Sequence, residues 1–127
     1  MVALREVMSK EVFTTPGDAT VAEVAKSLLH GRFGSALVME GAWLIGIFTE
    51  RDVMRAAAAG ADMSSSKVSE WMTADPVTVG PEMDSEEAAD LMLSQGFRHL
   101  PVVEGKNVSG IVSLRDLLGT RIRRPSK

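Results

Sequence analysis

The chain has 127 residues, 45% hydrophobic and 24% charged, which is enough for one compact domain, and its formal net charge is −3. It has no cysteine, so disulfides, thiolate metal sites and cysteine nucleophiles are excluded, and the composition is compatible with a reducing cytoplasm. No run approaches the roughly 18 apolar residues of a membrane helix, and the first residues lack the apolar run of a signal peptide. We therefore expect a cytoplasmic protein without a membrane span.

The first elements predicted along the chain are a strand and a helix. A short apolar stretch over residues 12–15 predicts the strand, which ends at the turn-forming pair Pro16-Gly17. Thr20 and Glu23 have the spacing of a capping box and predict a helix start, and Gly31 is predicted to end this helix. The apolar residues predicted to share one face of the helix are Val21, Val24, Ala25, Leu28 and Leu29.

A hairpin and a second helix are predicted next. Residues 35–39 and 43–49 are apolar and β-rich, and the turn at 40–42 joins them. A helix is predicted from Glu50 to about residue 59. The small residues that follow, 60–66, are predicted to form a linker too short to separate independent domains.

The chain is predicted to be two copies of one unit. A shift of 64 residues aligns the halves without a gap and brings Phe33 onto Phe97, for example. The corresponding elements of the second half are a strand over 77–79, a helix opened by Asp84 with Glu87 and ended at Gly96, a hairpin over 99–113, and a helix over 114–123. We expect an α/β (α+β) fold of two repeats, residues 1–64 with the linker and residues 65–127, each a three-stranded sheet with two helices on one face. Packed sheet to sheet about a pseudo-twofold axis, the repeats would form one cooperative module.

Each predicted hairpin runs into a helix through a hydroxyl residue that is followed, three residues later, by a carboxylate. These residues are Thr49 with Asp52 and Ser113 with Asp116. One interpretation is structural, because a hydroxyl caps a helix and a carboxylate favours its first turn. The other is ligand binding: amides at a helix start attract phosphate, a carboxylate suits the two hydroxyls of a ribose, and the neighbouring arginine offers a donor fork. Both interpretations stay open from these residues alone.

The repeated motifs resemble the CBS domain pair, or Bateman module, over nearly the whole chain. The signature residues are GIFTERD at 46–52 and GIVSLRD at 110–116, with VMS at 7–9, WMT at 71–73 and LPVV at 100–103. The resemblance implies binding of AMP, ADP, ATP or a related adenosyl compound, such as S-adenosylmethionine or NAD, in two clefts between the repeats. It also implies a disc-shaped homodimer, and a regulatory role toward another protein.

The resemblance assigns residues to both clefts, each taking its helix-start residues from one repeat and its remaining wall from the other. One cleft would comprise Ile111, Ser113, Arg115 and Asp116 with Val12, Thr14, Ser35 and Ala36. The second cleft would comprise Ile47, Thr49, Arg51 and Asp52 with Pro76, Thr78, His99 and Leu100. Just upstream of the helix starts, Gly46 and Gly110 would allow a close approach of the backbone.

The two copies differ along these walls. Residues 34–37 read Gly-Ser-Ala-Leu, whereas residues 98–101 read Arg-His-Leu-Pro, which is bulkier and more basic. One hypothesis is that the two sites have different affinities or phosphate preferences. The alternative is that Arg98 faces solvent and His99 only fills the wall.

The function expected from the sequence is a non-catalytic sensor that needs no cofactor and holds no metal. An enzyme would need a nucleophile with a base, a metal cluster or opposed carboxylates, and the two histidines are far apart in the sequence. The alternative function is an interaction module with empty clefts that acts only through protein contacts. The negative charge argues against nucleic-acid binding, and we interpret the basic tail as a solvated end. That tail comprises Arg121, Arg123, Arg124 and Lys127.

Overall fold

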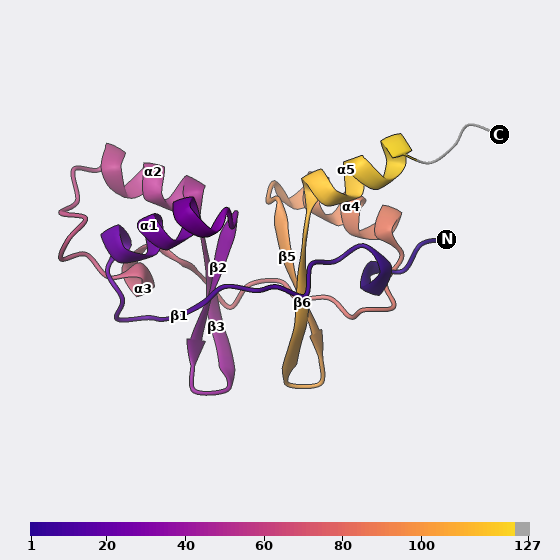
Figure 1. Cartoon of the computed structure of the whole chain (residues 1–127), viewed down its shortest axis with the longest axis horizontal. Coiled ribbons are helices and arrows are strands. Elements are labelled where there is room, and N and C mark those ends of the chain that lie inside the picture. The colour runs from indigo at the N-terminus through magenta and orange to yellow at the C-terminus, as the bar shows by residue number, and fades with distance from the viewer. Residues whose placement is uncertain (124–127) are drawn as a thin grey trace. The chain divides into compact units, whose positions relative to one another are not determined.

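The structure is a computed structural model that describes the backbone of residues 1–123 and the side chains up to residue 119 (Figure 1). The tail residues Arg124 and Lys127, and the side chains of Arg121 and Arg123, lie outside this description. The chain divides into two compact units. We call Val12–Pro76 the central unit, and Met1–Glu11 together with the chain from Val77 onward the split unit.

The central unit is built on a four-stranded sheet with the order β1-β2-β3-β4 (Figure 1). Strand β2 (Ser35–Glu40) and strand β3 (Trp43–Thr49) form the predicted antiparallel hairpin, and β1 (Thr14–Pro16) pairs in parallel with β2. Strand β4 (Thr73–Ala74) completes the sheet by pairing antiparallel with β3. This sheet therefore has one more strand than the sequence predicts.

The capping box predicted at the start of α1 (Val21–Gly31) is confirmed. The Thr20 hydroxyl accepts from the Glu23 backbone N–H at 3.1 Å, and the Glu23 carboxylate accepts from the Thr20 N–H at 2.9 Å. The predicted end is wrong by one residue. Gly31 is still helical, and Arg32 takes the left-handed conformation, with φ of 58°, that ends the helix.

The remaining helices of the central unit are α2 (Glu50–Ala58) and α3 (Val68–Trp71). The sheet and these helices bury a core around Phe48, which is fully buried. The buried members of this core are Val21, Val24, Leu28, Ala36, Val38, Phe48, Ala56 and Val68. Leu29 was predicted to share this face, and this is wrong because its side chain is 76% exposed.

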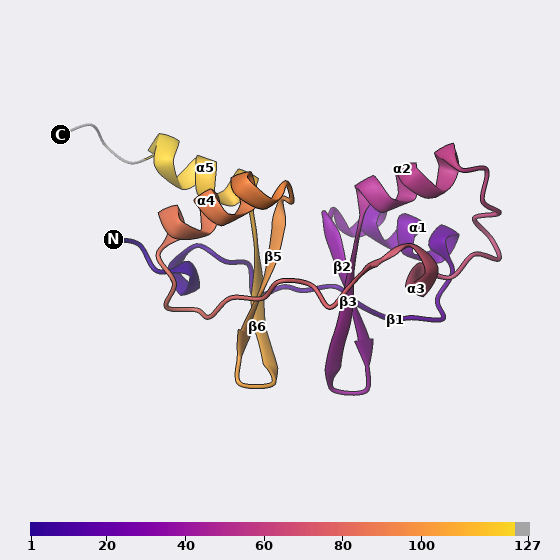
Figure 2. The same ribbon diagram turned by 180° about the vertical axis from the view of Figure 1, so that it is seen from behind.

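The split unit contains α4 (Ser85–Gln95), the hairpin of β5 (His99–Glu104) and β6 (Asn107–Ser113), and α5 (Leu114–Arg123) (Figure 2). The hairpin and both helices confirm the predicted elements, and with the central unit they confirm the mixed α/β class. A separate core packs around Met92 and Leu100. None of the described helices is both long and apolar enough to cross a membrane.

Two local predictions for the split unit are wrong. Residues 77–79 do not form a strand, because only Val79 pairs, in an isolated parallel bridge with Val102. The Asp84 side chain makes no capping hydrogen bond at the start of α4, unlike Thr20 at the matching position. Instead, the N–H of Ser85 donates to the Val2 carbonyl at 2.7 Å, so the N-terminal segment takes part in this helix start.

The opening segment of each sequence repeat packs on the other repeat. Near the N-terminus, Ser9 and Ile111 exchange two backbone hydrogen bonds of 2.8 and 2.9 Å along the edge of β6. In the central unit, the N–H of Val68 donates to the Ala19 carbonyl at 2.9 Å, and β4 pairs with β3. The compact units therefore cut the chain at residues 11 and 76. Residues 1–64 and 65–127 remain a prediction about sequence repeats, not about units in space.

Candidate functional site

The two hydroxyl–carboxylate motifs lie where a hairpin strand passes directly into a helix. Thr49 ends β3 and α2 begins at Glu50, while Ser113 ends β6 and α5 begins at Leu114. A residue at such a junction keeps an extended backbone, as Thr49 does with φ of −123° and ψ of 171°. The first amides of the following helix therefore point back along the strand end, which is the arrangement that attracts an anion.

At the start of α2, the Asp52 carboxylate is buried and reaches back to Thr49. Its Oδ2 accepts from the Thr49 N–H at 2.9 Å and from the Thr49 hydroxyl at 3.3 Å. The Thr49 hydroxyl makes no cap hydrogen bond to the helix, so it does not act as the helix cap that the structural interpretation expected. Asp52 is only 5% exposed, although it lies in the first turn of a surface helix.

Arg55 is a residue of this helix start that the sequence analysis missed. Its Nη1 donates to Oδ1 of Asp52 at 2.8 Å, and its guanidinium carbon lies 5.7 Å from the centroid of the Trp71 ring. The same Nη1 lies 3.4 Å from the Trp71 carbonyl oxygen. The spacing of three residues between Asp52 and Arg55 is the sequence signal that could have revealed the pair.

The start of α5 uses the same motif in a different way. The Ser113 hydroxyl accepts from the Asp116 N–H at 3.1 Å, and Oδ2 of Asp116 accepts from the Ser113 N–H at 3.2 Å. This reciprocal pair is a capping box, and Asp116 is exposed. The position that matches Arg55 is Gly119. The two helix starts are therefore alike in sequence motif but differ in burial, and Gly119 cannot make the contact that Arg55 makes.

The strands beside the helix starts bring one further predicted residue next to each motif. Ser35 is buried and pairs with Thr49 across β2 and β3, and the half-buried His99 pairs with Ser113 across β5 and β6. The other predicted residues of the central unit are Val12, Thr14, Ala36, Ile47, Arg51 and Pro76. Those of the split unit are Thr78, Leu100, Ile111 and Arg115. Each predicted cleft combines residues of the central unit with residues of the split unit. The structure describes each helix start together with the strands of its own unit, so the pairing of walls across the units stays a prediction.

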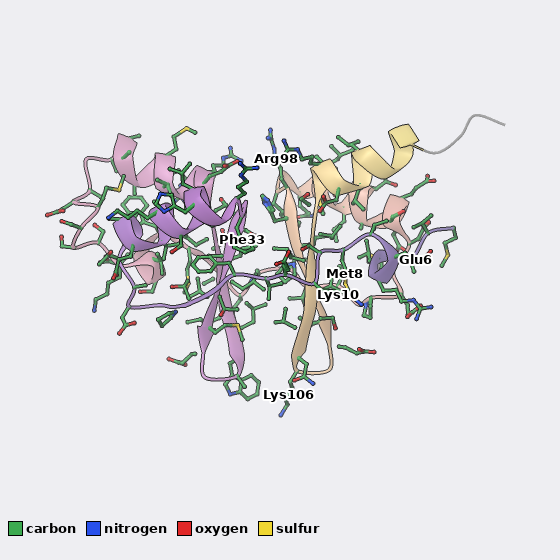
Figure 3. All side chains as sticks on the ribbon, in the orientation of Figure 1. Glu6, Met8, Lys10, Phe33, Arg98 and Lys106 are labelled. Atoms are coloured by element: carbon green, nitrogen blue, oxygen red, sulfur yellow. The ribbon has the colours of Figure 1, made fainter. Side chains whose placement is uncertain are left out.

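Gly46 and Gly110 serve the fold in a way that the sequence analysis did not predict. A Cβ at Gly46 would overlap the sulfur of Met72, and one at Gly110 would lie 2.9 Å from the sulfur of Met8, which Figure 3 labels. The groups that approach these glycines closely therefore belong to the opening segments of the two repeats, each of which packs on the other repeat; we call these the exchanged segments. The absence of a side chain lets residues 8–9 and 72–73 lie directly against the hairpin strands.

A shallow hollow of about 430 Å³ lies on the central unit beside β1 and the start of α1. Thr14 is the one predicted ligand residue that lines it. The described residues also contain no group of three His, Asp or Glu side chains arranged to hold a metal ion. The two hydroxyl–carboxylate helix starts thus remain the candidate site.

Comparison with known proteins identifies the family. The model of the CBS domain matches the chain twice, over residues 4–59 and 68–122. The chain belongs to the CBS domain family. Both hydroxyl–carboxylate motifs lie inside the matched ranges, so this CBS domain pair includes both candidate helix starts.

Similar proteins cover most of this CBS pair. The CBS domain-containing protein YhcV of Bacillus subtilis is 35% identical over 118 residues, which is 92% of this chain and 84% of YhcV. A hexameric CBS-CP12 protein from bloom-forming cyanobacteria matches with a TM-score of 0.89 and 31% identity, over 99% of this chain and 77% of that one. A CBS domain protein of Pyrobaculum aerophilum, solved in complex with AMP, matches with a TM-score of 0.82 and 27% identity, over 91% and 89% of the two chains.

Proposed function

We propose that this CBS pair is a regulatory sensor that binds an adenosyl ligand at the starts of α2 and α5 and passes its occupancy to a partner protein. The observation that carries the proposal is the placement of both Thr/Ser–Asp motifs at matching strand-to-helix junctions. The AMP complex of the Pyrobaculum aerophilum relative supports AMP as the first ligand to test. The wider ligand class comprises ADP, ATP, S-adenosylmethionine and NAD, which share the adenosyl unit.

The chemistry of each helix start fits a ribose next to a phosphate. The carboxylate of Asp52 or Asp116 can accept the two ribose hydroxyls, one on each oxygen. The first helical amides favour an anion, and the exposed guanidinium of Arg51 or Arg115 can add a planar donor pair. The remaining residues predicted for the two sites stay predictions, and so does the different affinity expected from residues 34–37 and 98–101.

Self-association is the second part of the proposal, with a homodimer as the assembly. Four exposed apolar side chains lie at matching positions of the two repeats: Leu29 with Leu93, and Met54 with Leu118. Their side chains are 76%, 62%, 68% and 41% exposed, in that order. Exposed apolar residues on surface helices are typical of protein contacts when they recur in this way. The hexameric cyanobacterial relative supports assembly of similar CBS pairs.

Calorimetric titration tests the proposed function directly. The purified, nucleotide-free protein is titrated with AMP, ADP, ATP, NAD and S-adenosylmethionine, and the titrations are repeated on Asp52→Ala and Asp116→Ala. We expect saturable binding of one ligand and the loss of one site in each variant. If no ligand binds to the folded protein, the sensor proposal fails, and a module that acts only through protein contacts replaces it.

A further inference from the structure

Arg55 connects the proposed ligand carboxylate Asp52 to the indole of Trp71. We propose that Arg55 is a positioning residue for ligand at the start of α2, and that Trp71 reports the occupancy of this site through Arg55. The inference rests on the proposed function and adds a structural connection through Arg55, a position at which the second helix start has Gly119.

The hydrogen-bonding capacity of Asp52 is compatible with Arg55 and a ribose at the same time. A carboxylate has about four acceptor positions, two on each oxygen. Thr49 fills both positions on Oδ2, and Arg55 fills one on Oδ1. A ribose needs one position on each oxygen. The contact from the Thr49 hydroxyl to Oδ2 is the longest of the three, at 3.3 Å. If this hydroxyl turned to a ligand phosphate, one acceptor position on Oδ2 would become free for the second ribose hydroxyl. Arg55 therefore stays in place while ligand binds.

The burial of Asp52 makes Arg55 necessary. The Asp52 side chain is 7% exposed, whereas that of Arg55 is 56% exposed. A buried carboxylate is costly unless a cation and hydrogen bonds compensate for its lost hydration. Without Arg55, the carboxylate would gain by turning toward water, and the acceptor for the ribose hydroxyls would no longer be held in position.

Trp71 also contacts the guanidinium. The distance of 5.7 Å from the guanidinium carbon to the ring centroid is within the range of a cation–π contact. A ligand hydroxyl that shares Oδ1 with Arg55 weakens the contact between Asp52 and Arg55 while Arg55 keeps its place, and the indole then faces a guanidinium whose charge is less neutralised. Trp71 is also the last residue of α3, two residues before β4 begins, so it lies in the segment exchanged between the repeats.

The sequence does not repeat Arg55 and Trp71 at the positions that correspond to them for the Asp116 helix start. The positions that match Arg55 and Trp71 are Gly119 and Val7. The inference therefore predicts a tryptophan signal from the Asp52 site and none from the Asp116 site.

The experiment uses Trp71 as the single tryptophan of the full chain. Because the chain has two tryptophans, Trp43→Phe leaves Trp71 as the only one. AMP and S-adenosylmethionine are titrated while fluorescence and heat are recorded. We expect a saturable change in Trp71 emission that persists in Asp116→Ala and disappears in Asp52→Ala. Arg55→Met should weaken one of the two sites about tenfold and remove the emission change. Arg55→Lys should restore most of the affinity, and the control Lys26→Met should bind as the parent does.

The outcomes separate the inference from the proposed function. Binding with an unchanged affinity in Arg55→Met, or an emission change that follows Asp116 instead of Asp52, overturns the role of Arg55 and leaves the sensor standing. An absence of heat with these two ligands and with ADP, ATP and NAD overturns the sensor and this inference together. The comparison of the two aspartate variants keeps Arg55 intact, so it decides the question even where Arg55→Met does not fold.

Discussion

Nη1 of Arg55 lies 2.8 Å from Oδ1 of Asp52, and this contact pairs an arginine of the last turn of α2 with the buried carboxylate of its first turn. The start of α5 carries the same motif with Asp116 exposed and a glycine at the position of the arginine. One sequence motif thus occurs once with a buried carboxylate and once with an exposed one. The difference leads to measurable consequences for stability as well as for binding.

Asp52→Ala is expected to destabilise the protein more than Asp116→Ala. The first change removes the acceptor of the Thr49 N–H and leaves Arg55 without its buried partner, which costs about 1–3 kcal/mol. The second removes an exposed capping carboxylate, at a cost of about 0.5–1 kcal/mol. Urea unfolding followed by circular dichroism measures both. Equal losses would show that burial of Asp52 does not distinguish the two helix starts.

Glu23→Gln is expected to lower stability at neutral pH and to have less effect in acid. Hydrogen bonds from the Thr20 backbone N–H and hydroxyl hold the pKa of Glu23 below its ordinary value of 4.5. A carboxylate with a lowered folded-state pKa stabilises the fold above the unfolded value and loses this contribution as the pH falls through the folded value. The difference between Glu23→Gln and the parent should therefore shrink below about pH 4.5.

The matched control for Glu23 is Glu87→Gln. Glu87 occupies the corresponding position in α4, where the Asp84 side chain makes no capping hydrogen bond. Unfolding curves of this variant should show little difference from the parent at any pH. A pH-dependent loss of the same size in both variants would contradict the assignment of the effect to the Thr20–Glu23 box.

Gly110→Ala is expected to destabilise the split unit by about 1–3 kcal/mol. The added Cβ would lie 2.5 Å from the Ser9 carbonyl oxygen, which is main chain and cannot turn away. Gly80→Ala provides the control, because no atom lies within 4 Å of its new Cβ. Thermal unfolding of the two variants should differ clearly. If Gly110→Ala matches Gly80→Ala, residues 8–9 do not lie against β6 in solution.

A fragment of residues 12–76 is expected to fold better than a fragment of residues 1–64. The first contains every strand of the four-stranded sheet and the buried Val68. The second lacks β4 and α3, and its first 11 residues have lost the strand edge that they pair with. Cooperative unfolding in urea would distinguish the two fragments. A sharper transition for residues 1–64 would favour the boundaries of the sequence repeats over those of the compact units.

Leu29→Glu or Leu93→Glu is expected to lower the mass of the protein measured by light scattering after size exclusion. The new charge would be buried in the proposed apolar contact between two copies of the chain and would weaken it. The control is Lys106→Glu, at the turn between β5 and β6 and away from α4 and α5 (Figure 3). An unchanged mass in both leucine variants, with a dimer in the parent, would place the contact elsewhere. A monomeric parent would remove the homodimer from the proposal.

Local patterns predicted most of the elements, because turn residues and apolar alternation act over a few residues. The hairpins and the Thr20–Glu23 box follow from such spacing. The same spacing at Asp84 did not produce a side-chain cap, and there the distant N-terminal segment binds the helix start through the Val2 carbonyl and the Ser85 N–H. Spacing alone predicted the cap in one repeat and not in the other.

The exchange of opening segments could not be predicted from the repeats. Residues 7–9 and 71–73 resemble one another, so either segment could pair with the edge of either hairpin. The sequence pattern is the same whether each segment packs on its own repeat or on the other one. Leu29 was misplaced for a different reason: its neighbour Leu28 lies on the buried face, and helical spacing alone does not set the width of that face. The spacing of Asp52 and Arg55 is a local signal, but the contact of Arg55 with Trp71 could not be predicted because Trp71 comes from one of the exchanged segments.

The exchange also sets an order for synthesis on the ribosome. Residues 12–76 emerge as one uninterrupted stretch and can fold while the rest of the chain is still being made. Ser9 must wait for Ile111, about 100 residues later, before its edge of β6 is complete. Residues 1–11 are therefore made before residues 12–76 and yet are among the last to find their place, so a bulky tag fused next to residue 1 would slow the completion of the split unit.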